Sequence, residues 1–378
     1  MGSCGKGKII SCNAAVAWAP HKPMSVERIQ VHPPDAGEVR IKIAYAALCH
    51  TDYFFLMESR DQTVRFPIVL GHEGAGVVES VGAGVQSVSV GDHVVPCAFA
   101  QCRQCANCHD SKSNLCDKYF GMKNMQTMET DGQSRFECAG QKLFHFGRCS
   151  TFSEFTVVPE AQVCKIDPKM PLDMACLLAC GVPTGYGAPL NGCAVNVGDV
   201  VGVWGLGTIG LAAVMGAAEA GASRLVAVDP NEKRFKMAKE LGATECVKPE
   251  EGLQKYFFQK FNGGLDIAFE ATGNIKAMRQ AFECTKRGSG RTCIMGVTEQ
   301  ELNIPTALLL QNRTIKGFIY GGWKCRDDVP MLAQKYTEGK LKLNEFASWQ
   351  CSLSEINEAV ARMERGDGLR SFIKMGSE

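Results

Sequence analysis

The chain has 378 residues, and its 41 Lys and Arg residues nearly balance its 40 Asp and Glu residues, which leaves a net charge of +1. The length predicts two or more domains, and a balanced charge without a basic run excludes a protein that follows a nucleic-acid backbone. Nineteen cysteines, in a chain whose residues 1–10 lack the apolar core of a signal peptide, indicate reduced thiols in the cytoplasm.

The first 180 residues are rich in Val, Gly and Pro, and short strands are expected at 38–44, 75–81 and 93–95. Turn residues separate these strands from one another. We therefore expect a mostly antiparallel β domain in this part of the chain.

Three short segments of this part carry residues that can bind a metal. Cys49 follows a predicted strand, His72 opens another, and Cys180 precedes the second half of the chain. Two thiolates and one imidazole leave a fourth position for water or substrate, which is the composition of a catalytic zinc site. No spacing rule joins the segments, and each residue taken alone is more often a core Cys or a packed His. The residues by themselves leave both interpretations open.

A group of four cysteines gives a stronger signal, because their spacing is C-x2-C-x2-C-x7-C. They are Cys102, Cys105, Cys108 and Cys116. Thiolates this close together can surround one tetrahedral cation, with Zn–S distances of about 2.3 Å. The spacing matches neither a redox pair nor a disulfide framework. An iron–sulfur cluster is the competing interpretation, since ferredoxins also carry a short C-x2-C-x2-C run. We expect a structural zinc that holds a loop in shape and performs no chemistry.

Residues 200–218 contain no charged side chain and are long enough, by length alone, to cross a membrane. They also contain five glycines, and Gly205, Gly207 and Gly210 form the pattern G-x-G-x-x-G after an expected buried strand at 200–204. This arrangement favours a phosphate-binding turn over a membrane helix.

The residues after the glycine pattern complete a dinucleotide-binding unit. A helix is expected at 211–220, followed by a second strand at 224–228 that ends in Asp229. An acid at the end of that strand is where the adenosine ribose of a dinucleotide would be held. Strand, glycine turn, helix, strand and acid together predict a nicotinamide dinucleotide site.

The alternation of helices and strands continues along the chain, as in a doubly wound parallel sheet. The expected elements are a helix at 231–241, a strand at 266–269, a helix at 275–284, and strands at 291–296 and 315–320. From about residue 325 the sequence returns to helix formers, including 354–365.

Several short runs of this sequence match a known family. They are Cys49-His50-Thr51-Asp52, Gly71-His72-Glu73-Gly74-Ala75-Gly76, the four-cysteine loop, Ser150-Thr151-Phe152-Ser153-Glu154-Phe155, Thr184-Gly185-Tyr186-Gly187, the glycine pattern, Gly321-Gly322-Trp323-Lys324 and Gly368-Leu369-Arg370. Through these runs the chain resembles, over nearly its whole length, the zinc-dependent medium-chain alcohol dehydrogenases. Within that family it is most similar to the class III and plant alcohol-dehydrogenase-like branch.

The resemblance implies an α/β protein of two domains. A GroES-like, mostly antiparallel β catalytic domain would span residues 1–181 and 324–378 and carry both zinc sites. A Rossmann NAD-binding domain with a doubly wound parallel sheet would span 182–323, with a cleft between the two domains. The resemblance also implies a homodimer joined through the Rossmann sheets. The expected partner is a small-molecule alcohol or aldehyde, with no role for nucleic acid or membrane.

The resemblance also implies two zinc ions per chain. The catalytic ion would be bound by Cys49, His72 and Cys180, with Glu73 as an occasional extra ligand. Asp52 would hydrogen-bond the histidine ligand and fix its tautomer. Thr51 would carry the proton of the substrate hydroxyl toward the cofactor ribose.

The cofactor implied is NAD(H), with NADP(H) less favoured because Asp229 would repel a 2′-phosphate. His50 and Arg370 match positions that touch the pyrophosphate, whereas Thr184 and Ile209 match positions that press the nicotinamide ring. The full set of expected cofactor-binding residues is His50, Thr184, Gly205, Leu206, Gly207, Thr208, Ile209, Gly210, Asp229, Arg234, Val297 and Arg370.

The expected substrate pocket departs from the family pattern. Phe54 stands where many members carry the last proton-relay residue, and Phe120 stands where class III enzymes carry an arginine for a glutathione carboxylate. Ala98 aligns with a large aromatic residue, although an insertion or deletion would put Phe99 there. Gly147, next to Phe146, aligns with an aliphatic residue.

These departures predict a wide, apolar pocket. We therefore expect an NAD(H)-dependent zinc alcohol dehydrogenase or aldehyde reductase that acts on a bulky, largely apolar alcohol or aldehyde of the specialised-metabolite kind. The alternatives are an S-(hydroxymethyl)glutathione dehydrogenase and a non-redox lyase of the cyanohydrin type on the same scaffold.

Overall fold

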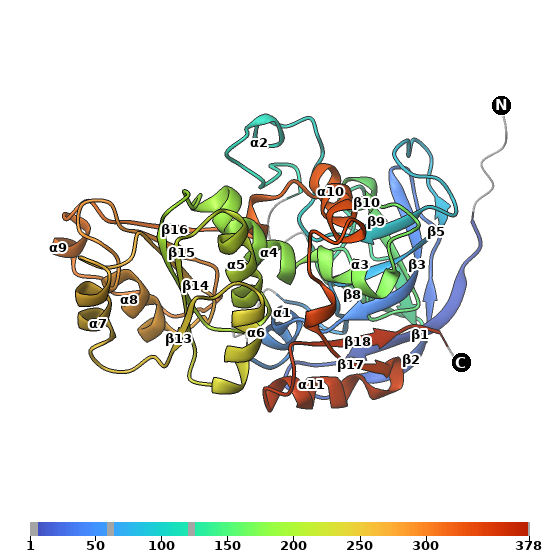
Figure 1. Ribbon diagram of the computed structural model, residues 1–378. Helices are drawn as coiled ribbons and strands as arrows, with labels where there is room; N and C mark the ends of the chain where they lie inside the picture. The colour runs from blue at the N-terminus through green and yellow to red at the C-terminus, as the bar shows by residue number, and fades with distance from the viewer. Residues whose placement is uncertain (1–6, 59–63, 120–124, 377–378) are drawn as a thin grey trace. The chain divides into compact units, whose positions relative to one another are not determined.

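The computed structural model describes residues 7–58, 64–119 and 125–376 (Figure 1). Its contacts divide the chain into two compact units, one formed by Met1–Cys180 with Lys324–Glu378 and the other by Gly181–Trp323. The second unit thus begins one residue before the boundary that the resemblance implies.

The first unit contains a closed β-barrel with the strand order β1-β2-β7-β8-β4. Its members are β1 (Ile10–Ala17), β2 (Ser25–Val31), β4 (Ile68–Val69), β7 (Phe136–Cys138) and β8 (Gln141–His145). All the pairings are antiparallel except that of β4 with β8. Apolar side chains such as Ile29, Val31 and Phe136 fill its interior.

A seven-stranded sheet forms the rest of the β structure in this unit. The strand order is β10-β6-β5-β3-β18-β17, with β9 paired to β3. The bounds are β3 (Glu38–Ala47), β5 (Glu73–Val81), β6 (His93–Pro96), β9 (Phe155–Pro159), β10 (Val163–Lys165), β17 (Ala347–Ser352) and β18 (Arg370–Lys374). The three strands expected from the sequence are present as β3, β5 and β6, each longer than predicted. The expectation of a mostly antiparallel β domain is therefore confirmed.

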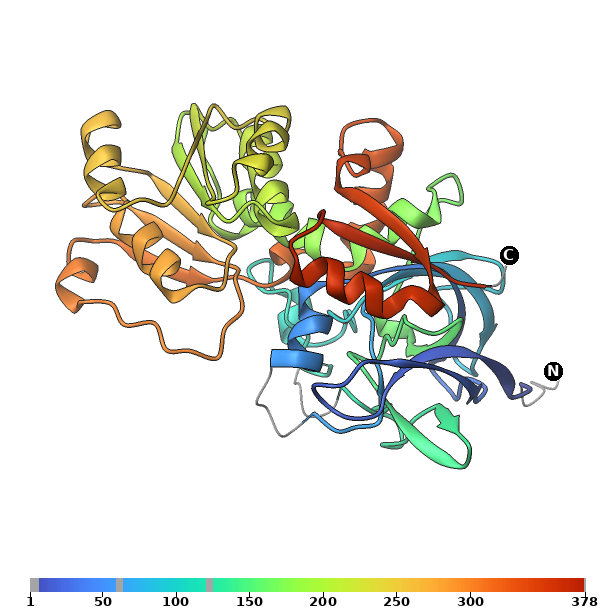
Figure 2. The same ribbon diagram turned by 90° about the horizontal axis from the view of Figure 1, so that it is seen from below.

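The helices of the first unit are mostly short. They are α1 (His50–Tyr53), α2 (Ala106–His109), α3 (Leu172–Ala175), α10 (Cys325–Thr337) and α11 (Ile356–Glu364). Figure 2 shows α11 beside β17, which it contacts. The helix expected at 354–365 is split, because a 3-10 turn at Leu353–Glu355 precedes α11. Ser352 and Glu355 form a capping box at this turn.

The second unit is built on a six-stranded parallel sheet of order β13-β12-β11-β14-β15-β16. The strands are β11 (Val200–Trp204), β12 (Arg224–Val228), β13 (Glu245–Val247), β14 (Ile267–Glu270), β15 (Arg291–Ile294) and β16 (Thr314–Gly317). The strand order reverses direction between β11 and β14, which is the topological switch point of a doubly wound sheet. The expected α/β fold is confirmed.

The helices of this unit contact one another in three pairs, α4 with α5, α5 with α6 and α7 with α8. Their bounds are α4 (Gly181–Gly187), α5 (Thr208–Glu219), α6 (Phe235–Glu240), α7 (Leu253–Lys260), α8 (Ile275–Glu283) and α9 (Thr306–Leu309). None of the described helices is long and apolar enough to cross a membrane. The uncharged run at 200–218 is divided instead between β11, the glycine turn and α5.

Two sequence predictions in this unit were wrong in detail. The helix expected at 231–241 is broken, since Asn231 caps a 3-10 turn before α6 begins. The strand expected at 315–320 ends at Gly317, because Tyr320 has a φ of 52° that no strand residue adopts. The short polar strand β13 and the helix α7 after it were not predicted.

The two ends of the second unit lie side by side. The Trp323 indole Nε1 donates a hydrogen bond to the Pro183 carbonyl oxygen at 2.9 Å, and Asn191 Nδ2 donates to the Gly321 carbonyl oxygen at 3.0 Å. A Cβ atom on Gly321 would lie 2.1 Å from the same Pro183 oxygen, so only glycine fits there. The chain therefore enters and leaves this unit at neighbouring points.

Candidate functional site

The structure brings together three segments that no spacing rule joins. Cys49 follows β3, His72 and Glu73 lie where β5 begins, and Cys180 is the last residue before the chain enters the second unit. Their ligand atoms all lie within 4.8 Å of one another, and all four residues are buried. The pairing of β3 with β5 fixes the first three residues relative to one another.

His72 has the hydrogen bonding of a metal ligand. Its Nδ1 lies 2.8 Å from Asp52 Oδ1, and the same carboxylate accepts hydrogen bonds from the backbone N–H groups of Cys49 at 3.0 Å and Gly71 at 3.1 Å. Its Nε2 is buried and has no hydrogen-bond partner among the described residues. A neutral imidazole with one nitrogen held by a carboxylate and the other facing two thiols fits a zinc ion.

One sulfur atom of this cluster, Sγ of Cys49, is favoured as a thiolate. A hydrogen bond with Cys180 lowers the pKa of Cys49 well below its usual value, against the effect of burial. The positive charge of Arg370 contributes in the same direction. Because a thiolate and not a thiol is the metal ligand, this environment suits zinc binding.

Arg370 reaches the same cluster, which the resemblance does not imply. Its Nε and Nη2 lie 3.0 and 3.1 Å from the two oxygens of Glu73, and Nη2 lies 3.4 Å from Cys49 Sγ. Burial raises the pKa of Glu73 to about 7 in spite of this ion pair. The structure therefore places Arg370 behind the candidate catalytic metal, while its contact with a pyrophosphate stays a prediction.

The four cysteines of the spaced pattern form a second cluster, with ligand atoms also within 4.8 Å of one another. Sγ of Cys102 lies 3.8 Å from Sγ of Cys108, and Sγ of Cys105 lies 3.9 Å from Sγ of Cys116. Backbone N–H groups of Cys105 and Cys108 donate to sulfur at 3.3 and 3.4 Å. Four sulfur atoms leave no place for a substrate, so the cluster fits a structural zinc.

Contacts from the start of α10 fasten this loop. Lys324 Nζ donates to the carbonyl oxygens of Cys108 at 2.6 Å and Asp110 at 2.8 Å. Arg103 Nη2 lies 2.6 Å from Asp327 Oδ1. No role was predicted for Lys324, although it belongs to one of the runs that match the family.

The glycine pattern lies between β11 and α5, as expected. Gly205 has a φ of 86°, and a Cβ atom on it would lie 2.6 Å from Thr272 Cγ2. A Cβ atom on Gly210 would lie 1.7 Å from the carbonyl oxygen of Gly205. Gly207 is different, because a Cβ atom there meets nothing within 4 Å. Packing therefore requires two of the glycines, and the third leaves open backbone that a pyrophosphate can approach.

The acid at the end of β12 lies against this turn. Asp229 Oδ2 accepts a hydrogen bond from the backbone N–H of Leu206 at 2.6 Å, and Oδ1 accepts one from Asn231 at 2.7 Å. Arg234 Nη1 lies 3.4 Å from the Leu206 carbonyl oxygen. The predicted turn, acid and arginine are thus in one place, and this place fits the adenosine half of a dinucleotide.

The other expected cofactor residues are distributed over both units. Thr208 and Ile209 open α5, and Thr184 is 7% exposed within α4. Val297, 70% exposed, follows β15. His50 begins α1 in the first unit, with Nε2 3.8 Å from Glu58 Oε2.

Aromatic side chains extend from the metal cluster. The ring of Phe146 lies 5.7 Å from that of His72 and 5.3 Å from that of Phe55, and Phe55 lies 5.4 Å from Phe54. Phe120, expected in the same pocket, lies outside the described residues. Apolar surface thus leads away from the candidate metal.

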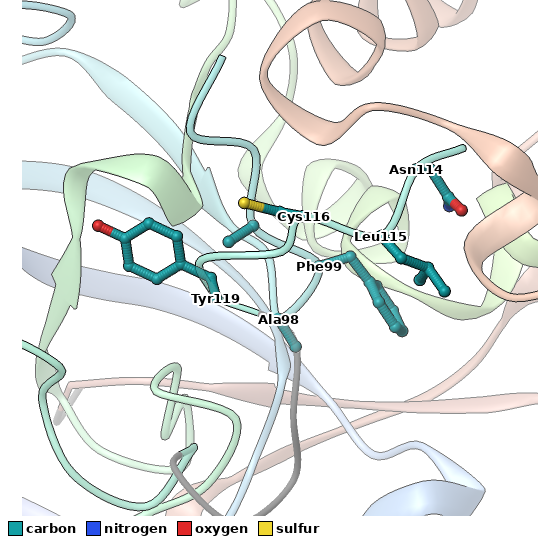
Figure 3. Close-up of a pocket in the computed structure, with 7 residues that line it drawn as sticks. Ala98, Phe99, Asn114, Leu115, Cys116 and Tyr119 are labelled. Carbon is teal, nitrogen blue, oxygen red and sulfur yellow. The ribbon is translucent and has the colours of Figure 1, made fainter. Parts of the chain in front are cut away.

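The two small residues of the expected pocket touch each other. A Cβ atom on Gly147 would lie 3.2 Å from Ala98 Cβ. Ala98 and Phe99 also line a hollow against the four-cysteine loop, together with Leu115 and Tyr119. Figure 3 shows the side chains of Phe99 and Leu115 beside one another, with the ring of Tyr119 on the opposite side. The wall that carries Ala98 is therefore shared with the loop of the second metal cluster.

Two family models match the chain, one described as an alcohol dehydrogenase GroES-like domain over residues 35–168 and one as a zinc-binding dehydrogenase over residues 208–338. An alcohol dehydrogenase class-3 from Caenorhabditis elegans is 46% identical over 376 residues, which are 97% of this chain and 97% of that protein.

Solved structures agree with these matches. An alcohol dehydrogenase zinc-binding domain protein from Burkholderia ambifaria has a TM-score of 0.89 and 32% identity, covering 98% of this chain and 100% of its own. A benzyl alcohol dehydrogenase from Acinetobacter calcoaceticus has a TM-score of 0.87 and 28% identity, covering 97% and 100%.

Proposed function

Because the chain belongs to the zinc-dependent alcohol dehydrogenase family, we propose that it oxidises or reduces a bulky, largely apolar alcohol or aldehyde with NAD(H). Membership of this family makes it an oxidoreductase that acts on alcohols with zinc and a nicotinamide dinucleotide. The observation that carries the finer proposal is the row of aromatic rings that runs from His72 through Phe146 to Phe55.

In the proposed mechanism, Cys49, His72 and Cys180 hold the catalytic zinc. When bound, this ion supplies Lewis acidity that polarises the substrate oxygen. Asp52 keeps the proton of His72 on Nδ1, so that Nε2 is free to be a ligand. Arg370 holds the Glu73 carboxylate by two hydrogen bonds and so controls whether it can act as a further ligand.

Thr51 is the proposed first carrier of the substrate proton. Its Oγ1 lies 3.8 Å from Cys49 Sγ, next to the metal cluster. In oxidation the Thr51 hydroxyl would accept the proton of the alcohol, and a bound nicotinamide ring would supply the hydride acceptor. Phe54, on the next turn, carries no group that titrates, so the proton must leave Thr51 by way of the cofactor ribose or water.

Support for a bulky substrate comes from the size of the side chains around this point. Ala98 and Gly147 are neighbours in space, since a Cβ atom added to Gly147 would lie 3.2 Å from Ala98 Cβ, and neither residue carries a large side chain. An apolar pocket binds by burying area, at about 25 cal/mol per Å2, so a wide pocket loses affinity for small alcohols and gains it for large ones. The similarity to a benzyl alcohol dehydrogenase supports an aromatic substrate of this kind.

The test is a comparison of kcat/KM for ethanol, benzyl alcohol, larger apolar aldehydes and S-(hydroxymethyl)glutathione. We expect the large apolar compounds to be the best substrates of the natural protein. Ala98→Phe is expected to shift the ratio of large to small substrates by about tenfold or more toward the small ones. Ala36→Phe, which adds the same side chain to an exposed turn, is the matched control and leaves the ratio unchanged.

The class-3 name of the C. elegans relative favours the glutathione adduct as the second candidate. If that adduct or ethanol is the best substrate of the natural protein, the bulky-substrate proposal is wrong. Product formation at a constant 340 nm absorbance would point to the lyase alternative instead.

A homodimer and a cytoplasmic location complete the proposal. Strand β16 is an edge of its sheet, and Leu310 and Leu309 just before it are 84% and 37% exposed. An unpaired edge beside apolar residues suits pairing with a second copy. The described cysteines form no disulfide, which suits a reducing compartment.

A further inference from the structure

A buried carboxylate at the end of a central strand has no role in the mechanism above. Glu270 is the last residue of β14 and is 0% exposed. Its Oε1 accepts hydrogen bonds from the backbone N–H of Thr272 at 2.6 Å and of Gly273 at 3.2 Å, and from the Thr272 hydroxyl. Its Oε2 is buried beside Gly296, where an added Cβ atom would lie 2.6 Å away, and the Gly296 backbone also contributes to holding the carboxylate.

Such a residue is costly to the folded state. Burial raises the pKa of Glu270, against the hydrogen bonds from Thr272, Gly273 and Gly296. Burying a carboxylate costs free energy even when it accepts hydrogen bonds, and an apolar residue at the end of the strand would avoid that cost. Glu270 is therefore better explained by the conformation that it imposes on the turn after β14 than by a contribution to stability.

What Glu270 shapes is the turn after β14, which packs tightly between two neighbouring loops. A Cβ atom on Gly205 would lie 2.6 Å from Thr272 Cγ2, and one on Gly273 would lie 2.5 Å from the Val297 carbonyl oxygen. On the other side, a Cβ atom on Gly296 would lie 2.1 Å from the Gly273 nitrogen. The turn thus has no freedom to move without displacing the glycine turn or the loop after β15.

The strand order of the parallel sheet indicates which part of a bound dinucleotide would lie near the turn after β14. Asp229, at the end of β12, marks the adenosine side, and the pyrophosphate belongs at the glycine turn after β11. A dinucleotide that crosses the switch point then continues over the carboxyl ends of β14 and β15. Glu270 ends β14, and the exposed Val297 follows β15.

We propose that Glu270 is a positioning residue for the nicotinamide end of the cofactor, acting through the backbone of Ala271–Gly273 and the Val297 loop. This inference rests on the proposed NAD(H)-dependent function and deepens it. Glu270 itself touches neither substrate nor cofactor in this proposal. It fixes the backbone of the turn after β14, against which the nicotinamide ring would be oriented for hydride transfer.

The test compares the binding of NADH with that of ADP-ribose, which lacks the nicotinamide. NADH affinity is measured by its fluorescence and ADP-ribose affinity by calorimetry, with the zinc-loaded full chain. Glu270→Ala is expected to raise the Kd for NADH about tenfold, because the turn loses several hydrogen bonds that fix it. The Kd for ADP-ribose is expected to stay within about twofold, since the glycine turn and Asp229 remain.

Two further variants keep the test decisive if Glu270→Ala folds poorly. Glu270→Gln retains an acceptor for the Thr272 and Gly273 N–H groups, so it is expected to bind NADH nearly as well as the natural protein. Thr272→Val removes one hydroxyl donor at constant shape. It is expected to raise the Kd for NADH by a smaller factor than Glu270→Ala does, and to leave the Kd for ADP-ribose unchanged.

The outcomes separate this inference from the proposed function. If Glu270→Ala weakens the binding of NADH and of ADP-ribose equally, or weakens the binding of neither, the assignment of Glu270 to the nicotinamide end is wrong. A natural protein that binds ADP-ribose but neither NADH nor NAD+ would overturn the proposed function itself.

Discussion

The two cysteine-rich centres of the first unit are built in opposite ways. The centre formed by Cys49, His72 and Cys180 is buried, and Asp52 hydrogen-bonds its proposed ligand His72. The four-cysteine loop has three half-exposed cysteines, and its described regular structure is one four-residue helix, α2. The fold thus organises the first centre for its metal, whereas the metal must organise the second. Removing metal should cost activity in one case and stability in the other.

The largest expected effect is on stability, from removal of a ligand in the exposed loop. Cys105→Ser should reduce the zinc content from two ions per chain to one and lower the melting temperature strongly. The binding free energy of a structural zinc counts as folding free energy, commonly about 10 kcal/mol in small peptides. Elemental analysis and calorimetry measure both quantities.

The matched control for this variant is Cys246→Ser, at a half-exposed cysteine outside both clusters. It should keep both zinc ions and nearly the natural melting temperature. Iron and a brown colour in the natural protein would show that the four cysteines hold an iron–sulfur cluster.

Removal of a ligand from the buried centre should act mainly on the reaction. Cys180→Ala is expected to lower kcat/KM by about 1000-fold or more, because a Lewis acid contributes several kcal/mol to the barrier. Its melting temperature should fall less than that of Cys105→Ser, since Cys49 and His72 are held by the surrounding fold. A steady-state assay and a melting curve on the same preparation check both parts. Activity close to that of the natural protein would exclude Cys180 as a ligand.

Loss of the carboxylate that supports the buried centre should have a smaller effect than loss of a metal ligand. Asp52→Asn keeps the shape of the side chain but removes the charge that fixes the His72 tautomer, so zinc affinity or activity should fall about 10- to 100-fold. Competition with a chelator measures the affinity. Asp110→Asn, at an exposed aspartate of the four-cysteine loop, is the comparison and should leave the catalytic zinc in place. If both variants behave alike, Asp52 does not orient the ligand.

Loss of the lysine that holds the four-cysteine loop should have the smallest effect on stability and zinc retention. Lys324→Met loses the charged donor to the Cys108 and Asp110 carbonyl oxygens, at a cost of about 1.5–3 kcal/mol. We expect faster loss of one zinc to a chelator and a melting temperature lower by a few degrees, with kcat unchanged. Lys112→Met, at an exposed lysine of the same loop, should change neither. Equal zinc-release rates in the two variants would contradict a fastening role for Lys324.

The same contrast explains how much of these sites could be predicted from the sequence. The four cysteines and the glycine pattern are neighbours in the chain, so their spacing carries the geometry. The buried centre depends on how β3 and β5 pair and on where Cys180 returns, which no spacing records. The Arg370–Glu73 ion pair joins residues 297 positions apart and was not predicted. Only the family resemblance connected these segments beforehand.

Within the second unit, the strands β11 and β12 were predicted with their observed bounds, because apolar residues fill them and glycine or acid ends them. The errors arose where a local polar contact or an unusual backbone angle intervened, as at Asn231 and Tyr320. No role was predicted for Glu270, although an acid that closes the apolar run Ile267–Glu270 is a signal that the sequence does contain.

The adjacent ends of the second unit have a consequence for protein engineering. The hydrogen bond from the Trp323 indole to the Pro183 carbonyl oxygen keeps the two ends of the segment Gly181–Trp323 close together. A segment with adjacent ends can be exchanged as one block. The proposed zinc ligand Cys180 lies just outside this segment and would stay with the first unit. Replacing this segment as one block with that of an NADP-specific relative should yield a chimera that changes its coenzyme while keeping its own metal ligands.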